Sequence, residues 1–385
     1  KIAKSRQWDL YTRVNDNARS EIEPAGDWAM IEAQLPPTWK ELAEKHGVSP
    51  RKVPWRPGAE VTDVSVPLRM ILNYVAANLS LKTTAAIAAA AGLSVMSAPA
   101  LHYWMQKYAP FLTALLLALT NSAKKFAAEC WAGYDILIVD ASSVSRPGAK
   151  GTTARIHYAL RLTDLQLVQV DVTDEKVGET FRHFAPMAKR GQLWIGDRGY
   201  ANPPGIAAIT AAGADVLVRY NRGSLPLYDA DGKLLDVRQK LAELNECGVA
   251  QEWEAFVHPH KRKPIGRIGG RLCAVRLPPN KAEEARKRLK REQGSDVTAE
   301  SLEMAEYVVL FTTATPERLG TEPIMKLYGL RWQVELSIKR DKSIAGLDRL
   351  PNFRDDTIRS WLLAKLVLTQ IARKIVSPDA ASFFS

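Results

Sequence analysis

The spacing of hydrophobic and polar positions changes near residue 131. Before that point apolar residues recur at helical spacing, and no acid follows an apolar strand-like run. After it, short apolar runs are separated by turn residues and helical stretches, an arrangement typical of α/β regions. The run from Ile136 to Val139 is continuous, which indicates a strand covered on both faces. The pattern therefore predicts an α-helical N-terminal region followed by an α/β region.

Three strands open the predicted α/β region, and a helix, a strand, a helix and a strand follow. The second and third strands are expected to form a hairpin, because Thr163 and Asp164 make a tight link between them. The expected strands are 135–143, 154–162, 165–174, a strand that ends just before Asp197, and 215–220. The expected helices are 178–189 and 203–212.

The α/β pattern is interrupted between residues 221 and 305. Short strand candidates at 253–257 and 271–277 indicate a mainly β insertion, and 281–291 reads as a strongly basic helix. Its basic surface is either a solvated face or a surface that lies along a nucleic acid. An apolar strand at 307–313 then resumes the α/β region. An amphipathic helix at 355–376 is expected to pack beneath the helix that precedes it.

That preceding helix, which begins near Thr321, carries two different stripes. A capping hydroxyl, an acid in the first turn and Pro323 make a good helix start. Its apolar stripe consists of Leu327, Leu330, Val334 and Ile338. Beside it, Tyr328, Arg331, Glu335 and Lys342 fall within roughly 60° of one helix face. Such a row is either a solvated face with ion pairs or a binding surface, and spacing alone leaves both readings open.

Two further acids stand at the ends of predicted strands. Asp140 closes the run DILIVD, and Asp197 follows the run LWIG. An acid just past the carboxyl end of a central strand lies where open α/β sheets place ligands, although single acids there often only cap a loop. If the fold brings these two acids together with Glu335, the three carboxylates repel one another unless a cation lies between them. His157, on the second strand, is interpreted as a structural group.

The net charge and the cysteine content limit which partners and which metal ions this chain is expected to bind. The formal net charge of +11 favours a polyanionic partner. The three cysteines lack metal-ligand spacing, which argues against a zinc site or a disulfide scaffold and fits a reducing cytoplasm. The longest apolar run, 111–119, is too short to span a bilayer. With oxygen ligands alone, the expected cation is Mg²⁺ or Mn²⁺.

Two motifs together resemble a known family. The sequence GDRGY around Asp197 and the spacing Y-x2-R-x3-E-x6-K from Tyr328 to Lys342 are similar to the YREK-signature transposases of bacterial insertion-sequence family four. The resemblance covers 134–377 and implies a DDE enzyme with an RNase H-like catalytic core. This chain differs in having Ala141 after the first acid, where relatives often have Gly, and in having Tyr307 near the place of a Trp associated with base flipping.

The resemblance implies a division of labour among the site residues. Asp140, Asp197 and Glu335 become catalytic carboxylates that hold two Mg²⁺ ions, with Mn²⁺ able to substitute. The DNA-binding residues become Tyr328, Arg331, Lys342, Tyr307 and Arg198. The implied partners are transposon-end DNA with terminal inverted repeats, target DNA, and a second copy of the chain in a homodimeric paired-end complex. The expected location is the bacterial cytoplasm, with association to the nucleoid through DNA.

The expected domains combine the pattern with this resemblance. They are a helical N-terminal region with a DNA-end-binding role at 1–130, a first part of the core at 131–220, a basic β-rich insertion at 221–305, a second part of the core at 306–377, and a tail at 378–385. Two stretches of the N-terminal region, 38–49 and 81–107, are either helix-turn-helix fragments or plain αα-hairpins. The chain opens with Lys1 and not with Met, so we expect that the sequence is truncated at either end.

Two other function classes stay open at this point. One is an RNase H-like endonuclease that cuts DNA or RNA without strand transfer. The other is a DNA-binding regulator descended from a transposase, although a regulator has no need of the three acids. Incubation with DNA that carries matching inverted repeats separates these classes from a transposase.

Overall fold

The structure is a computed structural model, and it describes residues 24–50, 61, 63–120, 131, 133–164, 166–258, 267–332, 346–347, 350 and 355–376. The chain divides into two compact units. One, the helical unit, joins the chain up to Leu119 with a segment that begins at Phe353, and the other, the sheet unit, spans Thr120–Asn352. Within the described ranges, no helix combines the length and the apolar character needed to cross a membrane.

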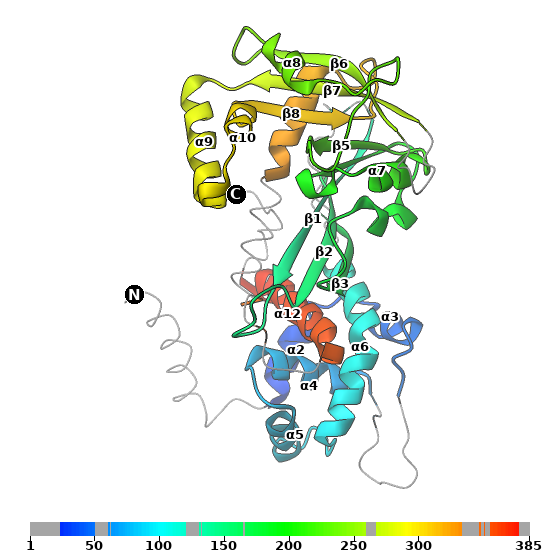
Figure 1. The fold of residues 1–385 in the computed structure, drawn as a ribbon. Helices are drawn as coiled ribbons and strands as arrows, with labels where there is room; N and C mark the ends of the chain where they lie inside the picture. The colour runs from blue at the N-terminus through cyan, green and yellow to red at the C-terminus, as the bar shows by residue number, and fades with distance from the viewer. Residues whose placement is uncertain are drawn as a thin grey trace. The chain divides into compact units, whose positions relative to one another are not determined.

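The helical unit is built around α6 and α12 (Figure 1). Its helices are α2 (Pro24–Glu32), α3 (Trp39–Lys45), α4 (Ser65–Ala76), α5 (Leu81–Ala90), α6 (Ala98–Leu119) and α12 (Asp355–Val376). The apolar side of α12, with Trp361 and Leu362 fully buried, packs against α6 and α4. The Ser360 hydroxyl donates to the Met105 carbonyl at 2.5 Å, and Gln106 donates to Asp356 at 2.8 Å.

This placement of α12 corrects an expectation. The bounds 355–376 are as predicted, but the helix belongs to the helical unit and not to the second part of the core. An amphipathic stripe requires burial and does not specify its partner. Here α6 supplies a long apolar surface that includes Phe111 and Leu115, and α12 covers it.

The two stretches that resemble helix-turn-helix fragments do contain helices and glycine turns. After α3 the chain turns at Gly47 (φ 75°), and after α5 it turns at Gly92 (φ 66°), both in the left-handed region that favours glycine. Ser80 caps α5 by accepting from the Thr83 amide. α6 runs on to Leu119, beyond the expected end at 107. Their role in DNA binding stays a prediction.

In the part of the sheet unit that the structure describes, eight strands form one mixed sheet, which confirms the α/β class. The strands are β1 (Asp135–Val144), β2 (Ala154–Arg161), β3 (Leu167–Asp174), β4 (Gln192–Gly196), β5 (Asp215–Arg219), β6 (Ala250–Val257), β7 (Ile268–Arg276) and β8 (Tyr307–Thr312). Their order is β3-β2-β1-β4-β5-β8-β7-β6. β1, β4 and β5 are parallel, and the hairpin of β2 and β3 forms as expected.

The stretch 178–189 is not the single helix that its pattern predicts. It forms two short 3-10 helices, η1 (Phe181–His183) and η2 (Ala185–Met187). Pro186 lacks an amide hydrogen, and its ring disfavours the α conformation at Ala185, so an α-helix cannot run through this point. The buried Phe181 and Phe184 hold the two turns against the core instead.

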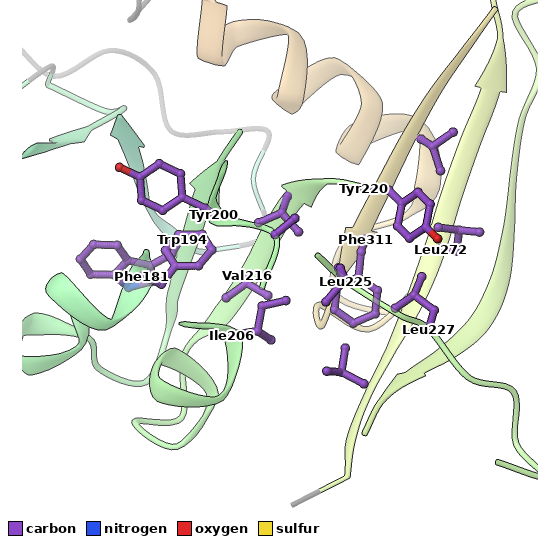
Figure 2. Packing of buried hydrophobic residues seen from close by; sticks show 14 of the residues in the cluster. Phe181, Trp194, Tyr200, Ile206, Val216, Tyr220, Leu225, Leu227, Leu272 and Phe311 are labelled. Atoms are coloured by element: carbon purple, nitrogen blue, oxygen red, sulfur yellow. The ribbon is translucent and has the colours of Figure 1, made fainter. Parts of the chain in front are cut away.

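The insertion extends the sheet of the core. β6 pairs with β7 and β7 pairs with β8, so the insertion strands continue the sheet beyond β5. The described helices of this unit are α7 (Pro203–Thr210), α8 (Val237–Ala242), α9 (Pro279–Gln293), α10 (Ala299–Met304) and a helix over 321–332. Figure 2 shows one buried cluster, with Phe181, Trp194 and Tyr200 on one side and Leu225, Leu272 and Phe311 on the other. The core is therefore continuous from β1 to the insertion.

Candidate active site at the carboxyl ends of the central strands

Strand register brings two predicted site residues to the same edge of the sheet. Ile138 of β1 lies opposite Ile195 of β4, so the same register two residues on sets Asp140 beside Asp197. Ile195 in turn lies opposite Leu217 of β5, which sets Arg219 next in the row. Because the parallel pairing of these strands ends at a common edge, the three neighbouring strands present two carboxylates and a guanidinium there.

Asp140 is oriented by a tyrosine on the neighbouring strand. The four residues before it, 136–139, are all buried, and Asp140 itself is half-buried where β1 leaves the core. The antiparallel pairing of β1 and β2 sets Tyr158 opposite Asp140, and the Tyr158 hydroxyl donates to Oδ2 at 2.8 Å. This bond fixes the carboxylate by one oxygen.

Asp197 is oriented by its own loop. Its Oδ1 accepts a hydrogen bond of 2.8 Å from the Gly199 amide, and it caps the short helix η3 (Arg198–Tyr200). Tyr200 is fully buried below this loop, and a Cβ added at Gly196 would lie 2.7 Å from Tyr200 Cβ. The two glycines of GDRGY therefore allow the loop to pack closely while it holds the acid at the strand end.

A third carboxylate that sequence reasoning missed lies near these two acids. Glu179, between β3 and η1, is half-buried. Burial, followed by the charges of Asp197 and Asp140, raises the pKa of Glu179 to about 7, while Arg155 acts in the opposite direction. We refer to Asp140, Glu179 and Asp197 as the carboxylate group. The residue was hidden because its stretch was read as an ordinary helix.

Four arginines lie beside the carboxylate group. Burial, followed by the charges of Arg198, Arg288 and Arg331, lowers the pKa of Arg219 to about 10, while Tyr328 acts in the opposite direction. We refer to Arg198, Arg219, Arg288 and Arg331 as the arginine group. They come from four elements: the Asp197 loop, β5, α9 and the helix over 321–332. Like charges held this close favour an anionic ligand.

Tyr328 connects the arginine group to Asp197. Its phenol is half-buried, and the Arg331 guanidinium lies 5.5 Å from its ring centroid. Burial raises the pKa of Tyr328, Arg331 and Arg219 lower it, and Asp197 raises it. The structure therefore brings Tyr328, Arg331 and Arg198 to the strand end that carries Asp197.

The other predicted site residues differ in where they lie. Glu335 and Lys342 fall outside the described residues. Tyr307 opens β8 opposite Arg276 of β7. Its pKa is raised by burial, and its nearest charges are those of Arg276, Glu306 and Glu303. β8 runs antiparallel to β5, so Tyr307 still lies toward the same edge of the sheet as the carboxylate group.

Comparison with known proteins decides the family. Residues 131–370 match the transposase DDE domain family. The chain belongs to this family. In Escherichia coli it is similar to the transposase for insertion sequence element IS421, with 30% identity over 326 residues, which cover 83% of this chain and 87% of the relative. It is equally similar to the protein of strain K12 named "Putative transposase InsL for insertion sequence element IS186A", with 30% identity over 325 residues and the same coverage.

Membership of the DDE family implies divalent cations, and the described residues fit them. Asp140 and Asp197 offer carboxylate oxygens on adjacent strands, and burial, followed by the charges of these two acids, raises the pKa of the third carboxylate, Glu179, to about 7. Among the described residues, no three His, Cys, Asp or Glu side chains are close enough to hold one metal ion. A third ligand must then come from elsewhere in the chain or from the substrate.

Proposed function

We propose that this protein is a DNA transposase of the YREK type in insertion-sequence family four, with an RNase H-like catalytic core. It cleaves at the ends of an insertion sequence and joins the freed 3′-hydroxyl ends to target DNA. The observation that carries this proposal is the register of β1 and β4, which sets Asp140 beside Asp197 just past their last paired residues, within a chain of the DDE family.

Asp140, Asp197 and Glu335 would hold two Mg²⁺ ions. When bound, such ions activate an attacking oxygen and stabilise the leaving oxygen at a DNA phosphate. The chain's own contribution is orientation. Tyr158 fixes one oxygen of Asp140, and the Gly199 amide fixes one oxygen of Asp197, so both carboxylates are held before substrate arrives.

The DNA strand near the cleaved end lies over the arginine group in this proposal. Arg198, Arg331 and Tyr328 converge beside Asp197, and a phosphate among them would relieve the repulsion that Arg219 experiences. Lys342 would extend the same row along the helix, and Tyr307 would contact the DNA farther along the edge of the sheet. Guanidinium groups suit this role because they bind phosphate through two hydrogen bonds.

The active assembly is a homodimer on two paired ends, and one helical stretch of the N-terminal unit serves end recognition. Joining both ends of one element to a target requires two active sites at one place. A mass measurement on the active complex tests this, with two protomers and two end duplexes expected.

The decisive experiment is incubation of the protein with DNA that carries its terminal inverted repeats, a target plasmid and Mg²⁺. We expect cleavage at the repeat ends and products in which the 3′ ends are joined to the target. Cleavage without joining would indicate an endonuclease, and binding without cleavage would indicate a regulator. Full cleavage in excess EDTA would contradict the role of the three carboxylates.

A further inference from the structure

The Glu179 side chain is built into the loop that presents Asp197. A Cβ added at Gly199 would collide with Glu179 Oε2 and would lie 3.1 Å from both its Cβ and its Cδ. The same Gly199 donates its amide to Asp197 Oδ1 at 2.8 Å. Gly199 therefore contacts both acids: its amide donates to the Asp197 carboxylate, and the Glu179 carboxylate packs against its Cα.

The backbone before Glu179 is also held in place. Arg155, on β2, donates from Nη1 to the Val177 carbonyl at 2.6 Å. On the other side, Thr180 caps η1 by accepting from the Arg182 amide. The segment from Val177 to Arg182 is thus fixed at both ends, and the position of the Glu179 carboxylate follows from specific contacts and not from an open surface loop.

A buried hydroxyl also faces this group of acids. Tyr200 is fully buried, and its hydroxyl oxygen has no hydrogen-bond partner within the described part of the chain. Burial raises the pKa of Tyr200, followed by the charges of Asp140, Glu179 and Asp197. A buried polar group without a partner is rare in folded proteins and indicates a missing polar ligand.

We propose that Glu179 is a positioning residue of the catalytic centre, which strengthens cation binding by Asp140 and Asp197 without joining them as a ligand. This inference rests on the proposed function. Glu179 acts through two routes: it adds a negative charge beside the two catalytic carboxylates, and it packs against Gly199 to hold the loop that orients Asp197.

The geometry separates this role from that of a direct ligand. Asp140, Glu179 and Asp197 do not form a group close enough to hold one metal ion in common. Yet the two aspartates raise the pKa of Glu179, so the three charges interact. Partners of this kind, outside the ligand set, commonly change metal affinity by about 10–100-fold when they are replaced.

The test measures Mn²⁺ binding to the full-length protein with end DNA, by electron paramagnetic resonance, in parallel with the Mg²⁺ dependence of cleavage. Glu179→Gln keeps the shape and removes the charge. The matched control is Glu175→Gln, which removes the same charge from an exposed residue of the β3–η1 segment. We expect Glu179→Gln to weaken Mn²⁺ binding about 10–100-fold and Glu175→Gln to leave it unchanged.

A second pair of variants tests the contact with Gly199. Gly199→Ala should displace the Glu179 carboxylate and weaken Mn²⁺ binding in the wild-type background. In a Glu179→Ala background, where the colliding carboxylate is gone, the same Gly199→Ala change should have a much smaller effect. Glu179→Asp keeps the charge and should restore part of the affinity that Glu179→Gln loses.

The outcomes are distinguishable. Wild-type Mn²⁺ affinity in a folded Glu179→Gln protein, or a loss confined to its melting temperature, would overturn the role of Glu179 and leave the transposase proposal intact. Equal effects of Gly199→Ala in both backgrounds would overturn the contact route. A wild-type protein that neither binds Mn²⁺ nor cleaves its ends would overturn the proposed function itself.

Discussion

The carboxylate group and the arginine group lie next to each other and have opposite charges. In each group, like charges repel one another. In the first, burial and two aspartates raise the pKa of Glu179 to about 7. In the second, burial and three other arginines lower the pKa of Arg219 to about 10. Each group repels itself when no ligand is present. In the proposed function, a cation would relieve the repulsion in the first group and a phosphate would relieve it in the second.

The two groups differ in how firmly they are held. Asp140 accepts a hydrogen bond from the Tyr158 hydroxyl, and Asp197 accepts one from the Gly199 amide, each at 2.8 Å. Arg198 and Arg288 are exposed, and Arg288 lies 3.9 Å from Glu292 of its own helix. Hydrogen-bonded carboxylates beside exposed guanidinium groups are consistent with a reaction whose chemical step needs accurate geometry.

The largest expected effect is at the carboxylate group. Asp140→Asn and Asp197→Asn keep the side-chain shape but remove a metal ligand, so cleavage of end DNA should fall by about 10³-fold or more. DNA binding without metal should be equal or tighter, because a negative charge is removed next to the phosphates. Glu335→Gln should behave alike, although this residue lies outside the described part of the chain.

The control for this prediction is Asp164→Asn, which removes an ion pair with Arg161 at 3.2 Å, away from the site. Gel assays of cleavage and of binding on the same preparations give both readouts. Near wild-type cleavage by a folded Asp197→Asn protein would contradict the assignment of the carboxylate group.

The second effect concerns the protonation of His157, which burial disfavours. His157 is fully buried on β2, accepts or donates one bond with Thr173 at 2.9 Å, and stacks on His183. Burial, then His183 and Arg155, lower the pKa of His157 to about 4, while Asp171 acts against them. The unfolded chain therefore binds this proton more tightly than the folded protein does.

The contribution of His157 to the free energy of unfolding should consequently be fully present above about pH 6.5. It should be lost as the pH drops toward 4, which lowers the free energy of unfolding by up to about 3 kcal/mol. Urea unfolding of wild type and of His157→Gln, measured from pH 7.5 to 4.5, checks this. The variant should be less stable at neutral pH and should lose less stability over the acidic range. Parallel pH profiles for the two proteins would show that His157 is not the source.

The third effect is at the arginine group. Arg219→Ala and Arg331→Ala should each weaken end binding by about tenfold, because each removes a charged group that binds phosphate. The slope of log affinity against log salt should also become shallower by about one unit for each phosphate that is no longer neutralised.

A matched control on the same helix is Lys326→Ala. Lys326 is exposed, and its charge is not among those that lower the pKa of Arg219. Binding titrations at several salt concentrations on the three variants distinguish the arginine group from an ordinary surface charge such as Lys326. Unchanged slopes for Arg219→Ala and Arg331→Ala would remove phosphate binding from this part of the site.

The sequence reveals the two groups unequally, for physical reasons. Asp140 and Asp197 could be found because each ends a continuous apolar run, and such runs are local features. Arg219 also ends a strand, but its meaning depends on three arginines from other elements. Glu179 depends on a contact with a glycine twenty residues later, which no local pattern records.

Two structural expectations failed for different reasons. The helix at 178–189 could have been rejected from Pro186 alone, since proline interrupts a helix interior. The partner of α12 could not have been predicted, because its stripe fits any apolar surface and α6 lies about 250 residues earlier in the chain, as the Gln106–Asp356 bond shows. Periodicity defines elements better than it defines their neighbours.

The smallest effect compares two basic residues on α9. Most basic side chains of this helix already have acidic partners: Lys281 pairs with Glu284, and Lys287 with Glu283 at 2.7 Å. Such surface pairs leave little net charge for DNA. Arg288 differs, because its charge reaches Arg219 and its contact with Glu292 is long, at 3.9 Å.

We therefore expect Arg288→Ala to weaken end binding by about twofold to threefold and to lower the salt slope by less than one unit, since the residue is exposed and screened. Lys287→Ala, one position away, should leave both quantities unchanged, because its ammonium is already engaged by Glu283. Binding curves for the two variants at low and moderate salt provide the measurement. Equal reductions for both would mean that α9 acts as a general basic surface, and the arginine group would then end at β5 and the helix over 321–332. A reduction for Arg288→Ala alone would extend the phosphate path from the strand ends onto the insertion.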